Sequence, residues 1–216
     1  SFGTRRIAVN TGGGDAPGLN AVIRAVVLAA EQRRWEVIGI RRGYEGLLDI
    51  SKTVNLDPDA VRGITHLGGT ILGTSNRGNP MKWPEVQEDG SVKEIDRSDE
   101  ILRAFEERDL HCLIAIGGDG SLTIARRLRD KGLPVVGIPK TIDNDLEATQ
   151  LTFGFLTAVE TATDAIAHGK SAQEAADYAI QVMFERTGGY GGLIILDHRG
   201  EAAFAYNTPH MVAAWS

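Results

Sequence analysis

Short apolar runs alternate with amphipathic stretches along the first three quarters of the chain. Four of these runs have the length of buried strands, namely Ile7–Val9, Val37–Ile40, Leu113–Ile116 and Pro134–Ile138. Between the first two, apolar residues recur at helical spacing from Leu19 to Ala30. Because alternating strands and helices build a parallel sheet with helices on its faces, the sequence predicts an α/β fold with a doubly wound, mostly parallel sheet.

Further helices are expected where polar and apolar residues mix at helical spacing: 57–64, a helix capped by Ser98, 121–129 and 155–167, the last ended by Gly169. Residues 68–73 are expected to form a turn and a short extended piece. Residues 76–97 are polar and include Pro80, Pro84 and Gly90, which predicts a long surface excursion.

From Lys170 the pattern changes. Ser171 and Glu174 have the spacing of a capping box, which begins a helix. Two apolar runs, Leu193–Leu196 and Ala202–Tyr206, flank a turn and predict a β-hairpin. We therefore expect two regions, with the alternating α/β pattern in 1–168 and a helix plus β-hairpin in the tail, 169–216.

Three segments rich in glycine or acidic residues follow predicted strands: Gly12–Gly18, Gly117–Ser121 and Pro139–Asp145. The first two are expected to open a helix, and the third is expected to be a polar loop. The carboxyl ends of parallel strands meet at one edge of a sheet, where helix N-termini bind phosphate. Glycine lets backbone N–H groups approach an anion closely, and carboxylates hold a divalent cation or accept a proton. These residue types indicate phosphoryl transfer from a nucleotide.

Composition excludes several other classes. The net charge is −6, from 29 acidic and 23 basic residues, which argues against binding to nucleic acid or to an anionic membrane surface. No signal peptide or membrane-spanning apolar run is visible. Cys112 is the one cysteine, so no intramolecular disulfide can form, and a reducing, cytoplasmic location is expected.

In their order, the three segments resemble the phosphofructokinase family, and so do Gly69–Arg77 and Thr152–Ala158. The resemblance extends over about residues 5–168. It implies the glycolytic transfer of a phosphoryl group from ATP, with Mg²⁺, to the 1-hydroxyl of fructose 6-phosphate. Since the family is commonly tetrameric, it also implies a homo-oligomer.

The resemblance implies a role for each matching residue. Asp143 would be the general base on the sugar hydroxyl, and Thr141 and Asp145 would flank it, contacting sugar phosphate or organising the metal. Asp119 would bind Mg²⁺. The residues that would line the nucleotide or cradle its phosphates are Gly13, Gly14, Tyr44, Arg77, Gly118, Gly120 and Ser121.

Two positions bear on the phosphoryl donor. Family members that use pyrophosphate usually carry an acidic residue where Gly120 stands, and such a side chain would repel the α-phosphate of ATP. Lys140 resembles the pyrophosphate users, in which a lysine contacts the donor phosphate, although some ATP users pair glycine with this lysine. ATP is therefore the favoured donor, with pyrophosphate as the alternative.

The second half of a full phosphofructokinase supplies arginines, a methionine-glycine-arginine loop and a later histidine to the sugar-phosphate site. None of these can be assigned in this sequence, so the substrate-binding half is missing from it. Without these cations the charge of the substrates is poorly offset. A second hypothesis is therefore a nucleotide- or phosphate-binding scaffold without turnover.

The tail resembles the carboxyl end of plant-type asparaginases and isoaspartyl peptidases, through Ser171–Tyr178, Gly188–Ile194 and Phe204–Met211. The threonine-bearing segments that supply the nucleophile in those hydrolases are absent, which disfavours an amidohydrolase. The two resemblances meet near residues 168–170. The sequence therefore predicts a kinase-type part joined to a hydrolase-type tail, as a natural fusion, a recombined chimera or a deliberately built protein.

Overall fold

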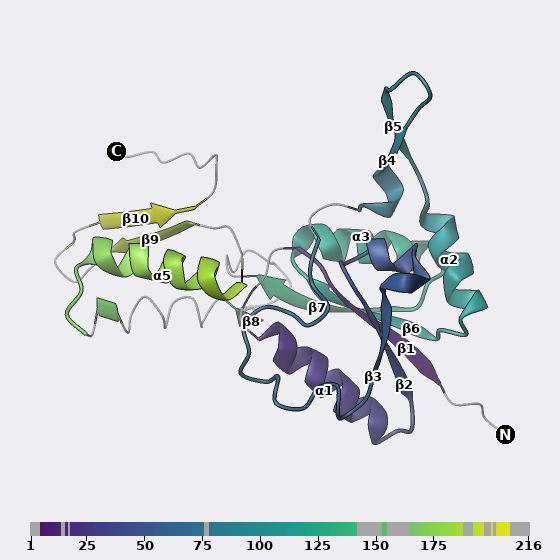
Figure 1. The fold of residues 1–216 in the computed structure, drawn as a ribbon, viewed down its shortest axis with the longest axis horizontal. Helices are drawn as coiled ribbons and strands as arrows, with labels where there is room; N and C mark the ends of the chain where they lie inside the picture. The colour runs from purple at the N-terminus through teal and green to yellow at the C-terminus, as the bar shows by residue number, and fades with distance from the viewer. Residues whose placement is uncertain are drawn as a thin grey trace.

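The computed structural model describes residues 5–13, 16, 18–75, 78–141, 153–154, 165–166, 168–187, 192–196, 200 and 202–207. Its main sheet has the strand order β3-β2-β1-β6-β7-β8 (Figure 1). These strands are β1 (Arg6–Thr11), β2 (Glu36–Ile40), β3 (Thr53–Leu56), β6 (Cys112–Gly117), β7 (Val135–Thr141) and β8 (Phe153–Gly154). All neighbours pair in parallel except β2 and β3. The predicted α/β fold with a mostly parallel sheet is confirmed.

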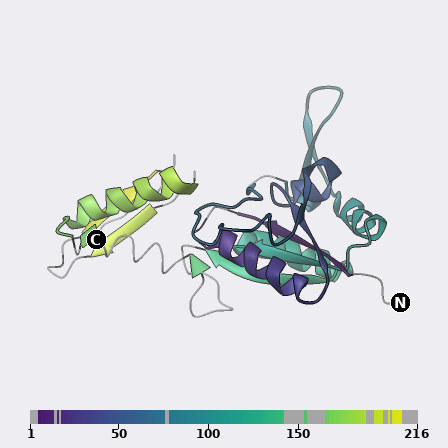
Figure 2. The ribbon, with the colours of Figure 1, turned by 60° about the horizontal axis from the view of Figure 1, so that its bottom comes forward.

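One face of the sheet is covered by α1 (Leu19–Glu31), as Figures 1 and 2 show. The buried side chains of α1 recur every three or four residues, so that they form one apolar stripe. This stripe packs with Ile7 and Val9 of β1 and Val37 of β2 into one apolar cluster. The predicted amphipathic helix is thus confirmed, and its apolar stripe faces the sheet.

The opposite face carries α2 (Ser98–Glu107) and α3 (Asp119–Asp130). A second apolar cluster joins these helices to the sheet, and it includes Ile101, Phe105, Ala125, Leu128, Ala8, Leu113 and Ala115. Because adjacent β1 residues belong to different clusters, both faces of the strand are buried. This explains why the predicted strands read as continuous apolar runs.

The side of the sheet on which the chain adds its next strand changes between β1 and β6. From β1 the chain passes through α1 to β2 on one side, and from β6 it passes through α3 to β7 on the other. The carboxyl ends of β1 and β6 therefore diverge into different layers at a topological switch point, where α/β sheets bind ligands. A hydrogen bond from Gly12 N to Ile116 O (2.8 Å) joins the two strand ends.

The prediction of a helix over 57–64 is wrong, because residues 58–63 form successive turns. Asp57 Oδ1 does accept a hydrogen bond from Ala60 N (2.7 Å), as a capping residue would. Gly63, however, has a φ of 75°, which is incompatible with a right-handed helix. The antiparallel edge strand β3 precedes these turns, with the short 3-10 helices η1 (Glu45–Leu47) and η2 (Ile50–Lys52) before it.

The excursion expected over 76–97 contains a β-hairpin of β4 (Trp83–Val86) and β5 (Val92–Ile95), after the 3-10 helix η3 (Pro80–Lys82). The hairpin projects from the body, as a surface excursion should (Figure 1). Ser98 is not the cap of α2, because Arg97 holds that position. Instead, Asp96 Oδ1 accepts hydrogen bonds from the N and Oγ atoms of Ser98, at 2.8 and 2.5 Å.

The tail forms α5 (Ala172–Thr187) and an antiparallel pair, β9 (Gly192–Leu196) and β10 (Ala202–Tyr206), which share a small apolar cluster with Ala165. The predicted capping box is confirmed, since Ser171 N donates to Glu174 Oε2 (2.8 Å) and Glu174 N to Ser171 Oγ (3.3 Å). Gly169 has the left-handed φ of 88° that its role as a helix stop requires. Most of the helix expected over 155–167 lies outside the described residues.

Candidate functional site

The three glycine-rich or acidic segments meet at the carboxyl edge of the sheet. A Cβ atom added at Gly13 would lie 3.7 Å from Ser121 Oγ, 3.8 Å from Lys140 Nζ and 3.9 Å from the backbone N of Gly118. Gly13 follows β1, Gly118 follows β6 and Lys140 is near the end of β7. The structure therefore brings together residues from all three segments, as the predicted parallel sheet requires.

Glycine is needed where the loop after β1 touches the first turn of α3. A Cβ atom at Gly12 would lie 2.3 Å from Ser121 Oγ, and one at Gly117 would lie 2.5 Å from Ser121 Cβ and 3.1 Å from Gly12 O. Gly13 has a φ of 78°, which residues with side chains rarely adopt. The close approach of Gly12 and Gly117 to Ser121, and of Gly117 to the backbone of Gly12, explains this glycine pattern.

The first turn of α3 is suited to bind an anion. Gly118 is its N-cap residue and supplies no side-chain hydrogen bond, and Leu122 N is bonded to Gly118 O (2.9 Å). The preceding N–H groups of the turn have no intrahelical acceptor, and the helix dipole is positive at this end. A phosphate beside Gly118 and Gly120 would accept hydrogen bonds from these groups.

Lys140 and Thr141 are the last residues of β7 and are buried, with 3% and 9% of their surface exposed. Their expected place in a polar loop is wrong, because the pairing of β7 with β8 extends the strand to Thr141. The strand fixes the backbone of Lys140 beside Gly117, whose partner in register is Pro139. A buried ammonium group next to the α3 N-terminus favours a negatively charged ligand.

Asp119, the predicted metal ligand, is exposed at the first position of α3. Over the part of the chain that the structure describes, no group of three or more His, Cys, Asp or Glu residues could hold a metal ion. Mg²⁺ commonly uses one or two carboxylates and takes its other ligands from phosphate and water. A single carboxylate beside a phosphate-binding turn fits that donor set.

Tyr44 is buried behind the site, with 4% of its surface exposed. Its hydroxyl donates a hydrogen bond to the backbone oxygen of Ser121 (2.7 Å). Burial raises the pKa of this hydroxyl, so that it stays protonated and remains a donor. Tyr44 therefore supports the first turn of α3, and its predicted contact with nucleotide remains a prediction.

Four predicted site residues, Gly14, Arg77, Asp143 and Asp145, lie outside the described residues. Their roles as nucleotide-binding and catalytic residues therefore stay predictions. Thr141, two residues before Asp143 in the sequence, lies at the carboxyl edge of the sheet.

The residues that attach loop 67–75 to the site were not predicted from the sequence. Asn20 in α1 donates from Nδ2 to the carbonyl oxygens of Leu67 (3.1 Å) and Gly68 (3.2 Å), and its Oδ1 accepts from Ile71 N (2.8 Å). Thr11 Oγ1, at the end of β1, lies 3.0 Å from Gly73 O and donates to it. The available signal was a polar residue, Asn20, on the buried stripe of an amphipathic helix.

Asn10 is a second polar residue that interrupts an apolar run. It is buried in β1 two residues before Gly12, and its neighbours in register are Ile40 and Ala115. Its Nδ2 atom has no hydrogen-bond partner within the described part of the chain. None of the roles predicted from the sequence involves the side-chain amide of Asn10.

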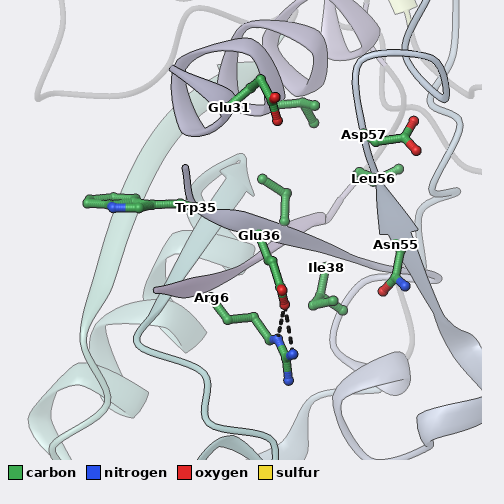
Figure 3. A pocket seen from close by; sticks show the side chains of 10 residues that line it. Arg6, Glu31, Trp35, Glu36, Ile38, Asn55, Leu56 and Asp57 are labelled. Carbon is green, nitrogen blue, oxygen red and sulfur yellow. Dashed lines mark hydrogen bonds and ion pairs between the residues drawn. The ribbon is translucent and has the colours of Figure 1, made fainter. Parts of the chain in front are cut away.

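A cavity of about 410 Å³ lies away from the site, near the amino ends of β1 and β2 (Figure 3). Arg6 and Glu36 form an ion pair at its wall, with the Arg6 Nη2 and Glu36 Oε2 atoms 2.7 Å apart. Trp35 lines another side and lies under the guanidinium of Arg5. Since ligands of α/β sheets bind at the carboxyl edge, this cavity is not part of the candidate site.

Cys112 is partly buried in β6, and burial raises the pKa of its thiol, as expected for a packing residue. Over the described ranges, no helix combines the length and the apolar character needed to cross a bilayer.

Comparison with known proteins identifies similar chains. A family model described as phosphofructokinase matches residues 6–200. The ATP-dependent 6-phosphofructokinase 2 of Clostridium perfringens (strain 13 / Type A) is 50% identical over 163 residues, which are 75% of this chain and 44% of that protein. The pyrophosphate–fructose 6-phosphate 1-phosphotransferase of Amycolatopsis methanolica is 46% identical over 202 residues, which are 93% of this chain and 54% of that protein.

Solved structures agree with the fold. Phosphofructokinase from Saccharomyces cerevisiae superposes with a TM-score of 0.65 and 28% identity, covering 76% of this chain and 24% of that one. The chain spans about half the length of the curated relatives it matches. The family match continues past the expected join at 168–170, and the resemblance of the tail to asparaginases stays a prediction.

Proposed function

This chain belongs to the phosphofructokinase family, and we propose that it supplies the donor side of a 6-phosphofructokinase reaction. In this reaction a phosphoryl group passes from Mg-ATP to the 1-hydroxyl of fructose 6-phosphate. The observation that carries the proposal is the meeting of Gly13, the N-terminus of α3 and Lys140 at the switch point of the sheet. These groups offer backbone donors, a helix dipole and a cation to one anion.

The chain's own residues would bind and orient the donor phosphates. Backbone N–H groups at Gly118, Gly120 and Ser121 would donate to phosphate oxygens, and Lys140 would neutralise charge from the side of β7. Because these groups are fixed by two strands and a helix, they need little rearrangement when charge develops. Fixed positioning and charge neutralisation are the main requirements of phosphoryl transfer.

Asp119 would hold the magnesium ion at the edge of this phosphate site. Mg²⁺, when bound, neutralises and orients the phosphates of the donor. The carboxylate is exposed at the start of α3, where a metal ion bound to the donor phosphates could reach it.

Asp143 would accept the proton of the sugar hydroxyl as its oxygen attacks the terminal phosphorus and the bond to the leaving oxygen breaks. Thr141 and Asp145 would flank it. Support comes from the course of the chain, because β7 ends at Thr141 beside the phosphate site. The proposed base, Asp143, is thus two residues beyond the end of the strand that carries Lys140.

ATP is the proposed donor, with pyrophosphate as the alternative. Among the residues that the structure describes, none would lie within 4 Å of a Cβ atom at Gly120, which supports the approach of a nucleotide to this residue. The similar proteins include one named as ATP-dependent and one named as pyrophosphate-dependent. Gly120→Asp should therefore shift the preference from Mg-ATP toward pyrophosphate, measured as the ratio of the two dissociation constants.

A second candidate is a donor-binding scaffold without turnover, because the groups that meet at Gly13, the N-terminus of α3 and Lys140 account for phosphate binding but not for its transfer. A cytoplasmic homo-oligomer accords with either candidate. The test is ADP release on adding fructose 6-phosphate to the chain with Mg-ATP. Release by the wild type and by Asp130→Asn, but not by Asp143→Asn, supports the kinase; donor binding without release supports the scaffold.

A further inference from the structure

The loop that contains Ser75 and Gly78 is held by the side chain of Glu45. We infer that Glu45 is a positioning residue, which fixes this loop beside the phosphate site and thereby strengthens donor binding. The inference rests on the proposed function for its effect on donor affinity. Its structural part, the ordering of the loop, can be tested without any ligand.

The carboxylate of Glu45 lies at the first position of η1 and joins three groups. Oε1 accepts a hydrogen bond from Ser75 Oγ (2.6 Å). Oε2 pairs with Arg42 Nε (3.2 Å) and, at the longer distance of 3.9 Å, with Lys52 Nζ. Only 13% of the Glu45 side chain is exposed, so the hydrogen bond to Ser75 is largely shielded from water.

Glu45 also packs against the far side of the same loop. A Cβ atom at Gly78 would lie 2.6 Å from Glu45 Cγ and 3.3 Å from Trp83 Cζ3. Gly78 has a φ of 90°, so both its conformation and its contact with Glu45 require glycine. One side chain thus holds the loop at Ser75 and at Gly78, on either side of the predicted nucleotide residue Arg77.

The anchored loop lies next to the end of β1. A Cβ atom at Gly43 would be 3.5 Å from Thr11 O and 3.6 Å from both Ser75 N and Ser75 O. Thr11 directly precedes Gly12, which packs on Ser121, and its hydroxyl bonds to Gly73 O. A shift of Ser75 would therefore be transmitted to the backbone that borders the donor phosphates.

The hydrogen bond to Ser75 is expected to matter more than the two ion pairs. Arg42 is 64% exposed, and exposed ion pairs contribute little to stability. A short hydrogen bond to a shielded carboxylate is stronger than one between neutral groups. Glu45→Gln keeps an acceptor for Ser75 and loses only charge, whereas Glu45→Ala loses both.

The experiment compares Glu45→Ala, Glu45→Gln, Ser75→Ala and the matched control Glu36→Ala. Glu36 also belongs to an ion pair, but at the opposite edge of the sheet. In the unliganded chain, amide hydrogen exchange at 73–75 and Gly78 should become faster in Glu45→Ala and Ser75→Ala, and not in Glu36→Ala. A change confined to this loop distinguishes positioning from a general loss of stability.

Calorimetric titration with Mg-ATP provides the second readout. Glu45→Ala and Ser75→Ala should weaken binding by about tenfold, the range of one charge-assisted hydrogen bond. Glu45→Gln should recover about half of that loss, because it keeps an acceptor for Ser75 but loses the charge that strengthens the bond. Loop exchange and affinity in Glu45→Ala equal to those in Glu36→Ala would overturn the inference. If the wild type does not bind Mg-ATP, the proposed function fails, while the exchange comparison still tests Glu45.

Discussion

The hydroxyl of Tyr44 donates a hydrogen bond to the backbone oxygen of Ser121 at 2.7 Å. This bond joins the segment after β2 to the first turn of α3, 77 residues further along the chain. The turn would bind the donor phosphates, so Tyr44 contributes to its position from the buried side. The neighbouring residue, Glu45, anchors the loop at Ser75. Two adjacent side chains therefore fix two borders of the proposed site.

Tyr44→Phe removes this hydrogen bond and keeps the ring. We expect a loss of about 1 kcal/mol in the free energy of unfolding, the usual net value of one hydrogen bond, and weaker Mg-ATP binding. Urea unfolding and calorimetry measure the two effects. The matched control is Tyr178→Phe on the exposed side of α5. Equal stability and affinity in the two variants would contradict the role of the Tyr44 hydroxyl.

Gly117→Ala tests whether glycine is needed there for close packing, and Gly120→Ala tests whether glycine is needed for the approach of a ligand. At Gly117 the new methyl group would lie 2.5 Å from Ser121 Cβ, which cannot move by a simple side-chain rotation. We expect a loss of about 1–3 kcal/mol in unfolding free energy from this overpacking. At Gly120 no atom of the described part of the chain lies within 4 Å of the added methyl group, so alanine should stabilise α3 by up to about 1 kcal/mol.

The informative measurement is Mg-ATP affinity in Gly120→Ala. If a nucleotide approaches this residue closely, the variant will be at least as stable as the wild type but will bind Mg-ATP more weakly. Unchanged affinity in a stable variant would mean that Gly120 does not border the donor.

Asn20→Asp tests whether the hydrogen bonds of Asn20 hold loop 67–71 against α1. The carboxylate keeps an acceptor for Ile71 N but loses the two bonds that Nδ2 donates to the carbonyl oxygens of Leu67 and Gly68. Because Asn20 is buried, we expect a loss of about 2–3 kcal/mol in unfolding free energy at neutral pH. Asn55→Asp on the exposed edge strand is the control, and comparable losses in both variants would refute the prediction.

Acid should destabilise the start of α2. Hydrogen bonds from Ser98 Oγ and N hold the pKa of Asp96 below its ordinary value, with a smaller effect of Lys131. The ionised carboxylate therefore stabilises the fold above its unfolded pKa, about 4, and this contribution is lost as the pH falls through the lower folded value. Asp96→Asn should flatten the decrease in unfolding free energy below about pH 4. A pH dependence identical to that of the wild type would show that Asp96 contributes nothing.

The sequence predicted the sheet and the meeting of the glycine-rich segments for a simple reason. Strands buried on both faces read as continuous apolar runs, and the carboxyl ends of parallel strands share one edge. Gly13, Gly118 and Lys140 therefore had to lie close together once the topology was right. The capping box at Ser171 was equally predictable, because it depends on residues three positions apart.

The errors arose where distant residues or special backbone angles decide the structure. Local sequence favoured a helix after Asp57, but Gly63 adopts a left-handed conformation and the segment remains in turns. Lys140 is a strand residue because β7 pairs with β8, a contact that no local pattern encodes. The contacts of Tyr44 with Ser121 and of Glu45 with Ser75 likewise span 77 and 30 residues, so they became visible only in the fold.

The most direct test of the account is calorimetric titration of the chain with Mg-ATP, comparing the wild type with Asp119→Asn and with Asp130→Asn. Both carboxylates lie on α3 and are exposed, but only Asp119 is at its phosphate-binding end. The account predicts saturable binding by the wild type and Asp130→Asn, and binding at least tenfold weaker by Asp119→Asn, about 1.4 kcal/mol. No binding by the wild type, or equal binding by all three proteins, would contradict a magnesium–nucleotide site at the N-terminus of α3.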